Sequence, residues 1–477
     1  MISPQNPELQ AAQSNTRISV GSVPAKRLEL LKRTTSRCPV CHRVCPAEVW
    51  TTDEKPSRVM LERTCDVHGA AIACVATDAR FYWLAKGNPL NSGCDTKGGR
   101  CCAADGSVAG TLGKNAGGQG ELGFEQLSTC LALIEIVNSC NLSCPTCYAD
   151  SPLGVKGDVD AVPIGDLKRR IQGIIDRKGP IEILQLSGGE PTLHPEFFTL
   201  LEWARDNPGI QYLILNTNGI RLAHEPQFAE RVAAIFPKTG LQVYLQFDGV
   251  HAAGQEELRG ADLRPSKERA IQRCGEANIP VTLAMTVTPA NLAQVWASIQ
   301  YGLEFPHVHG ITFQPLFGSG RLGGGRPAAR LNTADIILAA VSQACGKLRM
   351  QDFTPLPCGD PNCATIGYLI RDKGRTWSIS HFLDFSKLQG FLKDKVHYTM
   401  EDLAKCGCES EPLGELLKGL EVKSSMAFRI MIKPFMDAWT WDQDRIDRCC
   451  THVIRPDGKL DSFCRYYSGF ADTLAAP

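Results

Sequence analysis

The cysteines constrain this chain more than any other feature. There are 21 of them among 477 residues, and the polar start of the chain shows no basic segment followed by an apolar run, as an export signal would. The cytosol keeps thiols reduced, so disulfides explain so many cysteines poorly. The cysteines also lie in three groups, near 38–102, at 140–147 and from 358 to 464. Clustered thiols in a reduced compartment predict metal or iron–sulfur ligands.

Composition narrows the class of protein further. Hydrophobic residues make up 43% of the chain, which is enough to bury a core and excludes overall disorder. The 51 basic and 51 acidic residues balance, so charge gives no reason to expect nucleic acid or an anionic membrane as a partner. No run of residues is long and apolar enough to span a bilayer. We therefore expect a cytoplasmic protein of roughly two to four domains.

Between residues 131 and 316, short apolar runs alternate with helical stretches. This alternation is typical of β/α units around a parallel sheet. Six such units predict an α/β fold with a partial (β/α)6 TIM-like barrel, whose active site should lie at the carboxyl ends of the strands. The expected strands are 131–137, 181–187, 212–216, 242–247, 280–287 and 310–316.

Changes in composition divide the chain into four parts. Residues 1–35 are expected to form a flexible tail that ends in a short basic helix around Ala25–Arg33. A Cys- and Gly-rich metal-ribbon domain follows over 36–129, and the barrel occupies 130–330. Cysteines return after the β/α rhythm fades, which predicts a separate C-terminal auxiliary iron–sulfur domain over 331–477.

The motif Cys140-x3-Cys144-x2-Cys147 directly follows the first expected strand. Three thiolates at this spacing can hold three irons of a [4Fe–4S] cluster and leave the fourth iron without a protein ligand. An open iron can bind the methionine part of S-adenosylmethionine (SAM), and an electron from the cluster then yields a 5′-deoxyadenosyl radical. The alternative is a zinc knuckle completed by a distant ligand, which the strand–loop context disfavours.

Glycines and polar residues end the next three expected strands. The second strand ends in Gly188, Gly189 and Glu190, where a backbone without Cβ atoms lets a ligand come close. Polar side chains at the ends of the third and fourth strands either contact ribose or substrate, or close the strands as turn residues. These candidates are Asn216, Asn218, Gln246 and Asp248.

The three-cysteine motif followed by Gly-Gly-Glu resembles the radical SAM superfamily. The resemblance implies that the three cysteines ligate the cluster and that the edge at residues 188–190 pairs with the amino group of SAM. Members usually place an aromatic residue just before the third cysteine, toward adenine. This chain has Thr146 there, and Tyr148 follows the cysteine.

A narrower resemblance covers most of the chain. It is similar to the tetraether lipid synthase family, which includes radical SAM pterin methyltransferases with a folate-type methylene donor. This resemblance implies extra [4Fe–4S] clusters, a rubredoxin-like iron, and either lipid coupling or C-methylation. The matching strings are CPVC, TCDVHG, CNLSCPTCYA, SGGEPT, NTNGIRLA, LQFDGV, ITFQPLFGSGR and RCCTHVIRPDGKLDSFCRYY.

A second metal site is predicted in the first cysteine group. Two short knuckles, one beginning at Cys38 and one at Cys65, have the spacing of a tetrahedral metal ribbon. Cys38, Cys41 and Cys65 are the expected ligands. Sulfur suits zinc and a single iron equally, and the family resemblance favours iron. The fourth ligand is open among His68, Cys45, Cys74 and Cys94.

Two further groups of cysteines are candidates. Around Cys94, Cys101 and Cys102, either a cluster or unligated surface thiols fit the spacing. The C-terminal group is too large for packing alone, and four of its thiols would saturate an auxiliary [4Fe–4S] cluster. Such a cluster could transfer electrons or shape the pocket, but it could not bind SAM. We favour Cys358, Cys363, Cys449 and Cys464 over Cys406, Cys408 and Cys450.

Together these features predict a radical SAM transferase that forms a C–C bond at an unactivated carbon. The leading prediction is reaction on a lipid-like chain, and the alternative is C-methylation of a pterin or other small metabolite. A non-catalytic iron–sulfur or zinc scaffold is disfavoured, because a scaffold needs no edge for the amino group of SAM. The expected partners are a small-molecule or lipid substrate and a low-potential electron donor of the flavodoxin or ferredoxin type.

Overall fold

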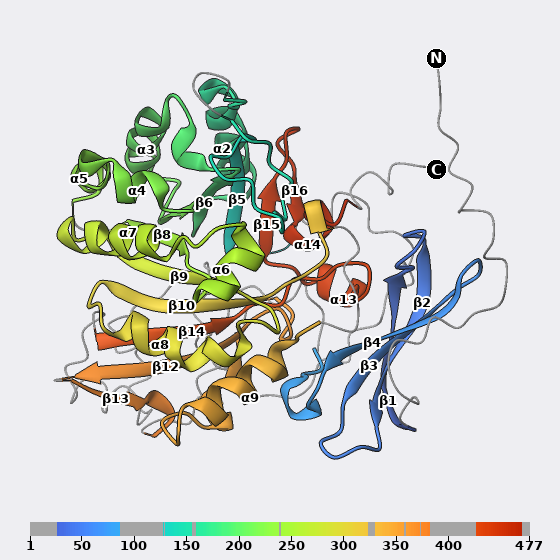
Figure 1. The fold of residues 1–477 in the computed structure, drawn as a ribbon. Helices are drawn as coiled ribbons and strands as arrows, with labels where there is room; N and C mark the ends of the chain where they lie inside the picture. The colour runs from blue at the N-terminus through green and yellow to red at the C-terminus, as the bar shows by residue number, and fades with distance from the viewer. Residues whose placement is uncertain are drawn as a thin grey trace, which may run out of the picture.

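In this computed structural model the chain forms a large sheet with helices on its outer face and, beside it, a small four-stranded sheet (Figure 1). The described residues are 26–85, 127, 129–154, 159–237, 240–322, 330–356, 359–372, 374–381 and 426–469.

Six parallel strands form the centre of the large sheet, and they correspond to the six expected from the sequence. Each is a short, mostly apolar run whose residues are largely buried. Strands that are consecutive along the chain are neighbours in the sheet, as successive β/α units require. They are β5 (Leu131–Val137), β6 (Leu184–Gly188), β7 (Leu213–Thr217), β8 (Leu241–Gln246), β9 (Val281–Val287) and β10 (Val308–Pro315).

Helices connect these strands and cover the outer face of the sheet (Figure 1). In α2 (Ile164–Lys178), the buried side chains Leu167, Ile171 and Ile174 recur at helical spacing and form one apolar stripe. Within the described ranges, none of the helices combines the length and the apolar character needed to cross a bilayer. The other helices are α3 (Phe197–Asp206), α4 (Ile220–His224), α5 (Pro226–Ile235), α6 (Ala252–Arg259), α7 (Arg264–Glu276), α8 (Val295–Leu303), α9 (Thr333–Gln343), α13 (Gln443–Ile446) and α14 (Phe463–Tyr467).

The large sheet continues beyond the six central strands on both edges. β14 (Ala427–Ile432) runs parallel to β10, and β15 (Thr451–Ile454) runs parallel to β5. Both strands follow residue 330, so the predicted boundary there does not separate two sheets. The sequence pattern missed them because they are short and do not alternate with long helices. The remaining edge strands are β11 (Thr354–Pro355), β12 (Thr365–Asp372), β13 (Arg375–Ser378) and β16 (Leu460–Ser462).

Side chains, rather than backbone hydrogen bonds, join β14 to β15 in the part of the chain that the structure describes. Lys433 follows β14, and its Nζ donates to Thr451 Oγ1 of β15 at 2.8 Å. Phe435 and Phe463 stack across the same gap with ring centroids 4.1 Å apart. The ladder of the sheet is therefore open, and side chains close the gap. We call this line of contact the seam.

Four antiparallel strands form the small sheet, which we call the ribbon. The expected basic helix at residues 25–33 is wrong, because residues 27–33 lie in the first strand of the ribbon. There Arg33 is paired with Glu48 of the second strand, and cross-strand pairing outweighs local helix propensity. The strands are β1 (Arg27–Arg37), β2 (Val44–Thr52), β3 (Val59–Cys65) and β4 (Gly69–Ala76).

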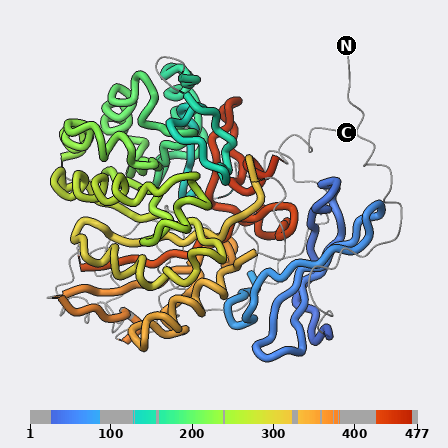
Figure 2. Tube along the Cα trace, viewed as in Figure 1, coloured from blue at the N-terminus to red at the C-terminus, as the bar shows by residue number. Residues whose placement is uncertain are grey.

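Buried charged groups attach the ribbon to the C-terminal segment of the chain. Arg63 of β3 is only 1% exposed and donates to the carbonyl oxygen of Ala438 at 2.7 Å. Lys32 of β1 forms an ion pair with Asp442 at 2.7 Å, and Asp442 caps the N-terminus of α13. Figure 2 shows the ribbon, in blue, beside this segment, in red. The ribbon is thus fixed to the main body rather than tethered to it.

Candidate functional site

The three cysteines of the central motif lie on the loop after β5 and line one cavity. The loop is held by backbone hydrogen bonds, among them Cys140 N to Pro152 O at 2.8 Å. Cys140 and Cys144 are nearly buried, and burial raises the pKa of the Cys140 thiol to about 12. Three thiols on one loop beside a cavity are a donor set that fits a [4Fe–4S] cluster with one open iron.

A segment after β10 fastens this loop from the other side. Arg321 donates through its backbone N–H to Cys147 O at 3.0 Å and through Nη1 to Cys144 O at 2.8 Å. Gly320 has a φ of +53°, and a Cβ there would lie 2.3 Å from Cys147 O. Sequence reasoning did not assign either residue to the site. The Gly-Ser-Gly-Arg string just after the sixth expected strand could have indicated that these two residues belong to the site.

Gly188 and Gly189 lie where β6 passes the start of the cysteine loop. A Cβ on Gly188 would be 2.1 Å from Val137 O, and one on Gly189 would be 2.2 Å from Ser139 O. Glycine is therefore required here by the chain's own backbone, and not only by the approach of a ligand as we expected. Both glycines also line the cavity.

Glu190 is only 1% exposed and is not among the residues that line the cavity. Its carboxylate accepts hydrogen bonds from Thr217 Oγ1 at 2.7 Å, Asn218 N at 2.8 Å and Thr192 Oγ1 at 2.7 Å. These contacts join the end of β6 to the end of β7. In the structure Glu190 thus holds the edge of the site in place.

Asp248 is fully buried and holds Arg259 of α6 in the cavity wall. The guanidinium donates to the carboxylate through Nε at 2.7 Å and through Nη2 at 3.0 Å. Burial lowers the pKa of Arg259, but Asp248 and the thiols of Cys144 and Cys147 outweigh it, so the pKa is raised. Gln246 faces the same guanidinium. Of the two candidates from the sequence, Gln246 lines the cavity and Asp248 does not. The sequence missed Arg259, which carries a positive charge into the cavity.

Asn216 and Asn218 both line the cavity, but each is also bonded within the protein. Asn218 Oδ1 accepts from Ile220 N at 3.0 Å, and its Nδ2 donates to Asn141 Oδ1 of the cysteine loop at 2.6 Å. Asn216 Nδ2 donates to Ser187 Oγ at 3.0 Å. The two alternatives weighed for these residues, turn closure and ligand contact, are therefore compatible.

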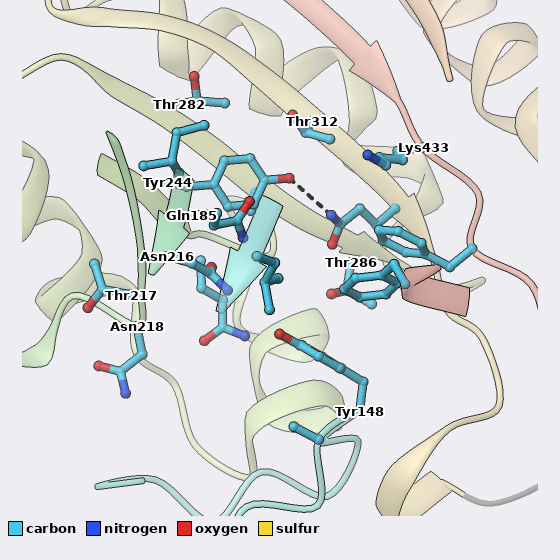
Figure 3. Close-up of a pocket in the computed structure, with 18 of the residues that line it drawn as sticks. Tyr148, Gln185, Asn216, Thr217, Asn218, Tyr244, Thr282, Thr286, Thr312 and Lys433 are labelled. Atoms are coloured by element: carbon cyan, nitrogen blue, oxygen red, sulfur yellow. Dashed lines mark hydrogen bonds between the residues drawn. The ribbon is translucent and has the colours of Figure 1, made fainter. Parts of the chain in front are cut away.

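The cavity has a volume of about 210 Å³ and two unlike walls. Hydroxyl and amide side chains from β8, β9 and β10 form one wall, where Gln314 Nε2 donates to the Tyr244 hydroxyl at 3.0 Å. Figure 3 shows Gln185, Asn216, Tyr244 and Tyr148 directed toward the same space. Aromatic rings at the seam form the other wall. The cavity therefore suits a molecule with a flat face and several polar edges.

A compact thiol group lies at one end of the ribbon. The ligand atoms of Cys38, Cys41, Cys65 and His68 all lie within 4.8 Å of one another. Cys41 Sγ is 3.7 Å from Cys65 Sγ, and His68 Nδ1 is 3.6 Å from Cys38 Sγ. Of the candidates for the fourth ligand that the structure describes (His68, Cys45 and Cys74), His68 therefore has the geometry to complete a tetrahedral metal site. Cys45 packs beside this group and donates to Arg43 O.

Cys363, Cys449, Cys450 and Cys464 lie close enough for the charge of one thiol to shift the pKa of another. Burial raises the pKa of Cys449, and Cys363, Cys450 and Cys464 raise it further. Arg445 Nη2 lies 3.8 Å from Cys363 Sγ. Cys450, which we set aside from the sequence, belongs to the same group. Candidates outside the described residues are Cys94, Cys101, Cys102, Cys358, Cys406 and Cys408.

Residues 134–301 match the family model described as the radical SAM superfamily. The protein is a radical SAM enzyme. Its cofactors therefore include a [4Fe–4S] cluster and SAM, as the sequence predicted. Residues 30–77 match a model described as the HMPTM N-terminal zinc ribbon domain. That description names zinc, whereas the family resemblance had favoured iron for the ribbon.

The chain is 27% identical to the 7,8-dihydro-6-hydroxymethylpterin dimethyltransferase of Methanocaldococcus jannaschii, over 91% of this chain and 93% of that protein. It is 28% identical to mycofactocin maturase MftC of Mycobacterium tuberculosis, over 34% of this chain and 38% of that protein. Among solved structures, HydG, a maturase of the [FeFe]-hydrogenase, aligns with a TM-score of 0.36 and 13% identity, over 46% of this chain and 50% of that one.

Proposed function

We propose that this radical SAM enzyme is a methyltransferase whose substrate is a pterin-like heterocycle. One observation carries the proposal: the similarity to the dihydropterin dimethyltransferase runs over 91% of the chain, far beyond the radical SAM domain at residues 134–301. The alternative reaction considered from the sequence, C-methylation, is thus favoured over the leading prediction of reaction on a lipid-like chain.

The cavity supports a small flat substrate. A ring could lie against Phe435 and Phe463 at the seam, and its amide edges could bond to Gln242, Tyr244 and Gln314 on the opposite wall. A long lipid chain would instead need an apolar surface along its whole length. Apolar side chains such as Leu133, Ile183 and Ile214 also line the cavity, but the hydroxyl and amide groups of the strand wall interrupt that surface. Those groups can bond to a heterocycle and not to a lipid chain, so the cavity favours the heterocycle.

We assign the cluster of the radical SAM domain to Cys140, Cys144 and Cys147. When bound, the cluster and SAM supply a radical that removes hydrogen from an unactivated carbon. Arg259 presents a cation beside Cys144, where it can bind the carboxylate of SAM. Asp248 keeps that cation in place. The electron for the cluster would come from a low-potential donor of the flavodoxin or ferredoxin type.

We assign a further [4Fe–4S] cluster to the thiols at the seam. Cys363, Cys449 and Cys464 are three of the four ligands favoured from the sequence, and the charges of Cys363, Cys464 and Cys450 all act on Cys449. Replacing Cys464 with Ala should lower the iron content and block product formation while part of the SAM cleavage survives. Replacing the exposed Cys345 with Ala is the matched control and should leave the iron content unchanged. Equal iron content in the two variants would contradict the assignment.

The proposed reaction is tested by following carbon into two classes of acceptor. Reconstituted enzyme is incubated without oxygen with SAM, dithionite, small molecules from a cell extract, and either 6-hydroxymethyl-7,8-dihydropterin or a lipid extract. We expect 5′-deoxyadenosine to form and the pterin to gain the mass of methyl groups, with the Cys144→Ala variant as the inactive control. Carbon added to the lipids and not to the pterin would contradict the proposal.

A further inference from the structure

The described residues that line the cavity include basic side chains and no acidic one. Among the residues that line it, Arg259, Arg429 and Lys433 carry positive charge, and none is Asp or Glu. Arg259 is neutralised by Asp248, which lies behind the wall. The other two cations come from β14 and from the residue just beyond it.

Arg429 and Lys433 share one face of this segment. Side chains alternate along a strand, so Arg429, Met431 and Lys433 point the same way, and all three line the cavity. Gly310 of β10 is paired with Arg429, and a Cβ at that glycine would lie 2.3 Å from the backbone oxygen of Arg429 and 3.0 Å from its Cβ. The glycine therefore lets β14 lie close to β10 at the residue that carries this cation.

Lys433 is bonded to a neutral group. Its Nζ donates to Thr451 Oγ1 at 2.8 Å and, within the described ranges, makes no ion pair. Its ammonium also lies 5.7 Å from the centre of the Phe435 ring, so it borders the aromatic wall. Among the described residues no carboxylate pairs with Lys433, so an acidic group on a ligand would stabilise this partly buried cation.

SAM does not supply that negative charge, because its single carboxylate is assigned to Arg259 and its other two charges are positive. We propose that the second ligand of the cavity carries an acidic group, a phosphate or a carboxylate, and that Lys433 and Arg429 bind it. This inference rests on the proposed function and makes it more specific: the substrate is an acidic derivative of the heterocycle. Its ring lies on the aromatic wall and its acidic arm reaches the two cations.

The test compares two ligands that differ only in charge. Binding of 6-hydroxymethyl-7,8-dihydropterin and of its phosphate monoester is measured on the reconstituted, SAM-loaded full chain without oxygen. We expect the phosphate ester to bind about tenfold to a hundredfold more tightly, as charge-assisted hydrogen bonds imply. Lys433→Met and Arg429→Met should each lose most of that advantage. Lys347→Met, whose ammonium lies over Trp296 and not in the cavity, should keep it.

A third arm uses inorganic phosphate alone and separates this inference from the proposed function. Phosphate binding that is lost in Lys433→Met supports the acidic-group site, even if neither pterin binds and the proposed function fails. Equal affinity for the two pterins, with no phosphate binding, overturns the site and leaves the proposed function standing. The site is also overturned if Lys433→Met lowers the iron content instead, because Lys433 would then serve the neighbouring thiols, on which its charge acts.

Discussion

Replacing Gly189 with Ala should damage the cysteine loop without touching a cysteine. The added Cβ would lie 2.2 Å from Ser139 O, where ordinary contact begins at 3.4 Å, so one backbone must move by about an ångström. The segment that has to move leads directly into Cys140. It is also held by Glu190 N, which donates to Ser139 O at 3.0 Å. We expect about 2–4 kcal/mol of destabilisation from overpacking and the strained hydrogen bond.

The assay combines thermal unfolding, iron per chain and 5′-deoxyadenosine formation. Gly189→Ala should melt at a lower temperature, bind less iron and cleave SAM more slowly than the parent. The matched control is Gly165→Ala in α2, where a Cβ meets nothing within 4 Å and the helix should gain about 0.5–1 kcal/mol. A Gly189→Ala protein with normal melting and a full complement of iron would refute the reasoning, because the clash would then be absorbed elsewhere.

Three further outcomes are expected. Asp248→Asn removes the counter-charge of a buried arginine, so it should lower the free energy of unfolding by about 3–5 kcal/mol and slow SAM cleavage. Asp262→Asn, in an exposed ion pair, should unfold like the parent. Equal unfolding of the two variants would contradict this. Cys140→Ala should abolish 5′-deoxyadenosine formation yet leave a brown protein, because the cluster proposed at the seam would keep its iron. Continued SAM cleavage would argue against the ligand assignment. Cys38→Ala should lose one metal equivalent from the ribbon in metal analysis, and Cys345→Ala should lose none; identical metal contents would contradict the ribbon site.

Local features of the sequence predicted the strands and the chemistry well. Each central strand is a continuous apolar run, and a buried parallel strand needs no more than that to be recognised. The three-cysteine motif and the Gly-Gly-Glu string identified the reaction class because each is a short run of residues that can be recognised by itself. The ribbon knuckles were equally local. Cys38, Cys41 and Cys65 come together with His68 as their spacing suggested.

Features that depend on distant contacts could not be predicted in this way. Arg259 is part of the site only because Asp248, on the preceding loop, turns it into the cavity. β1 was read as a helix because its pairing with β2 is invisible in its own residues. The strands after residue 330 were missed for the same reason, since β15 is defined by its place beside β5, more than three hundred residues earlier.

The position of the C-terminal thiols at the seam implies a structural role for a cluster bound there. Cys363 precedes β12, which belongs to the β14 edge of the sheet, whereas Cys449 and Cys464 belong to the β15–β16 edge. An iron–sulfur cluster held by these thiols would therefore cross-link the two edges. In the described part of the chain, no backbone hydrogen bonds pair β14 with β15 there. If oxygen destroyed the cluster, the Lys433–Thr451 hydrogen bond and the stacked rings would be the described contacts that still hold β14 to β15. Damage to that cluster would then loosen the wall of the substrate cavity at the same moment as it removes an electron carrier.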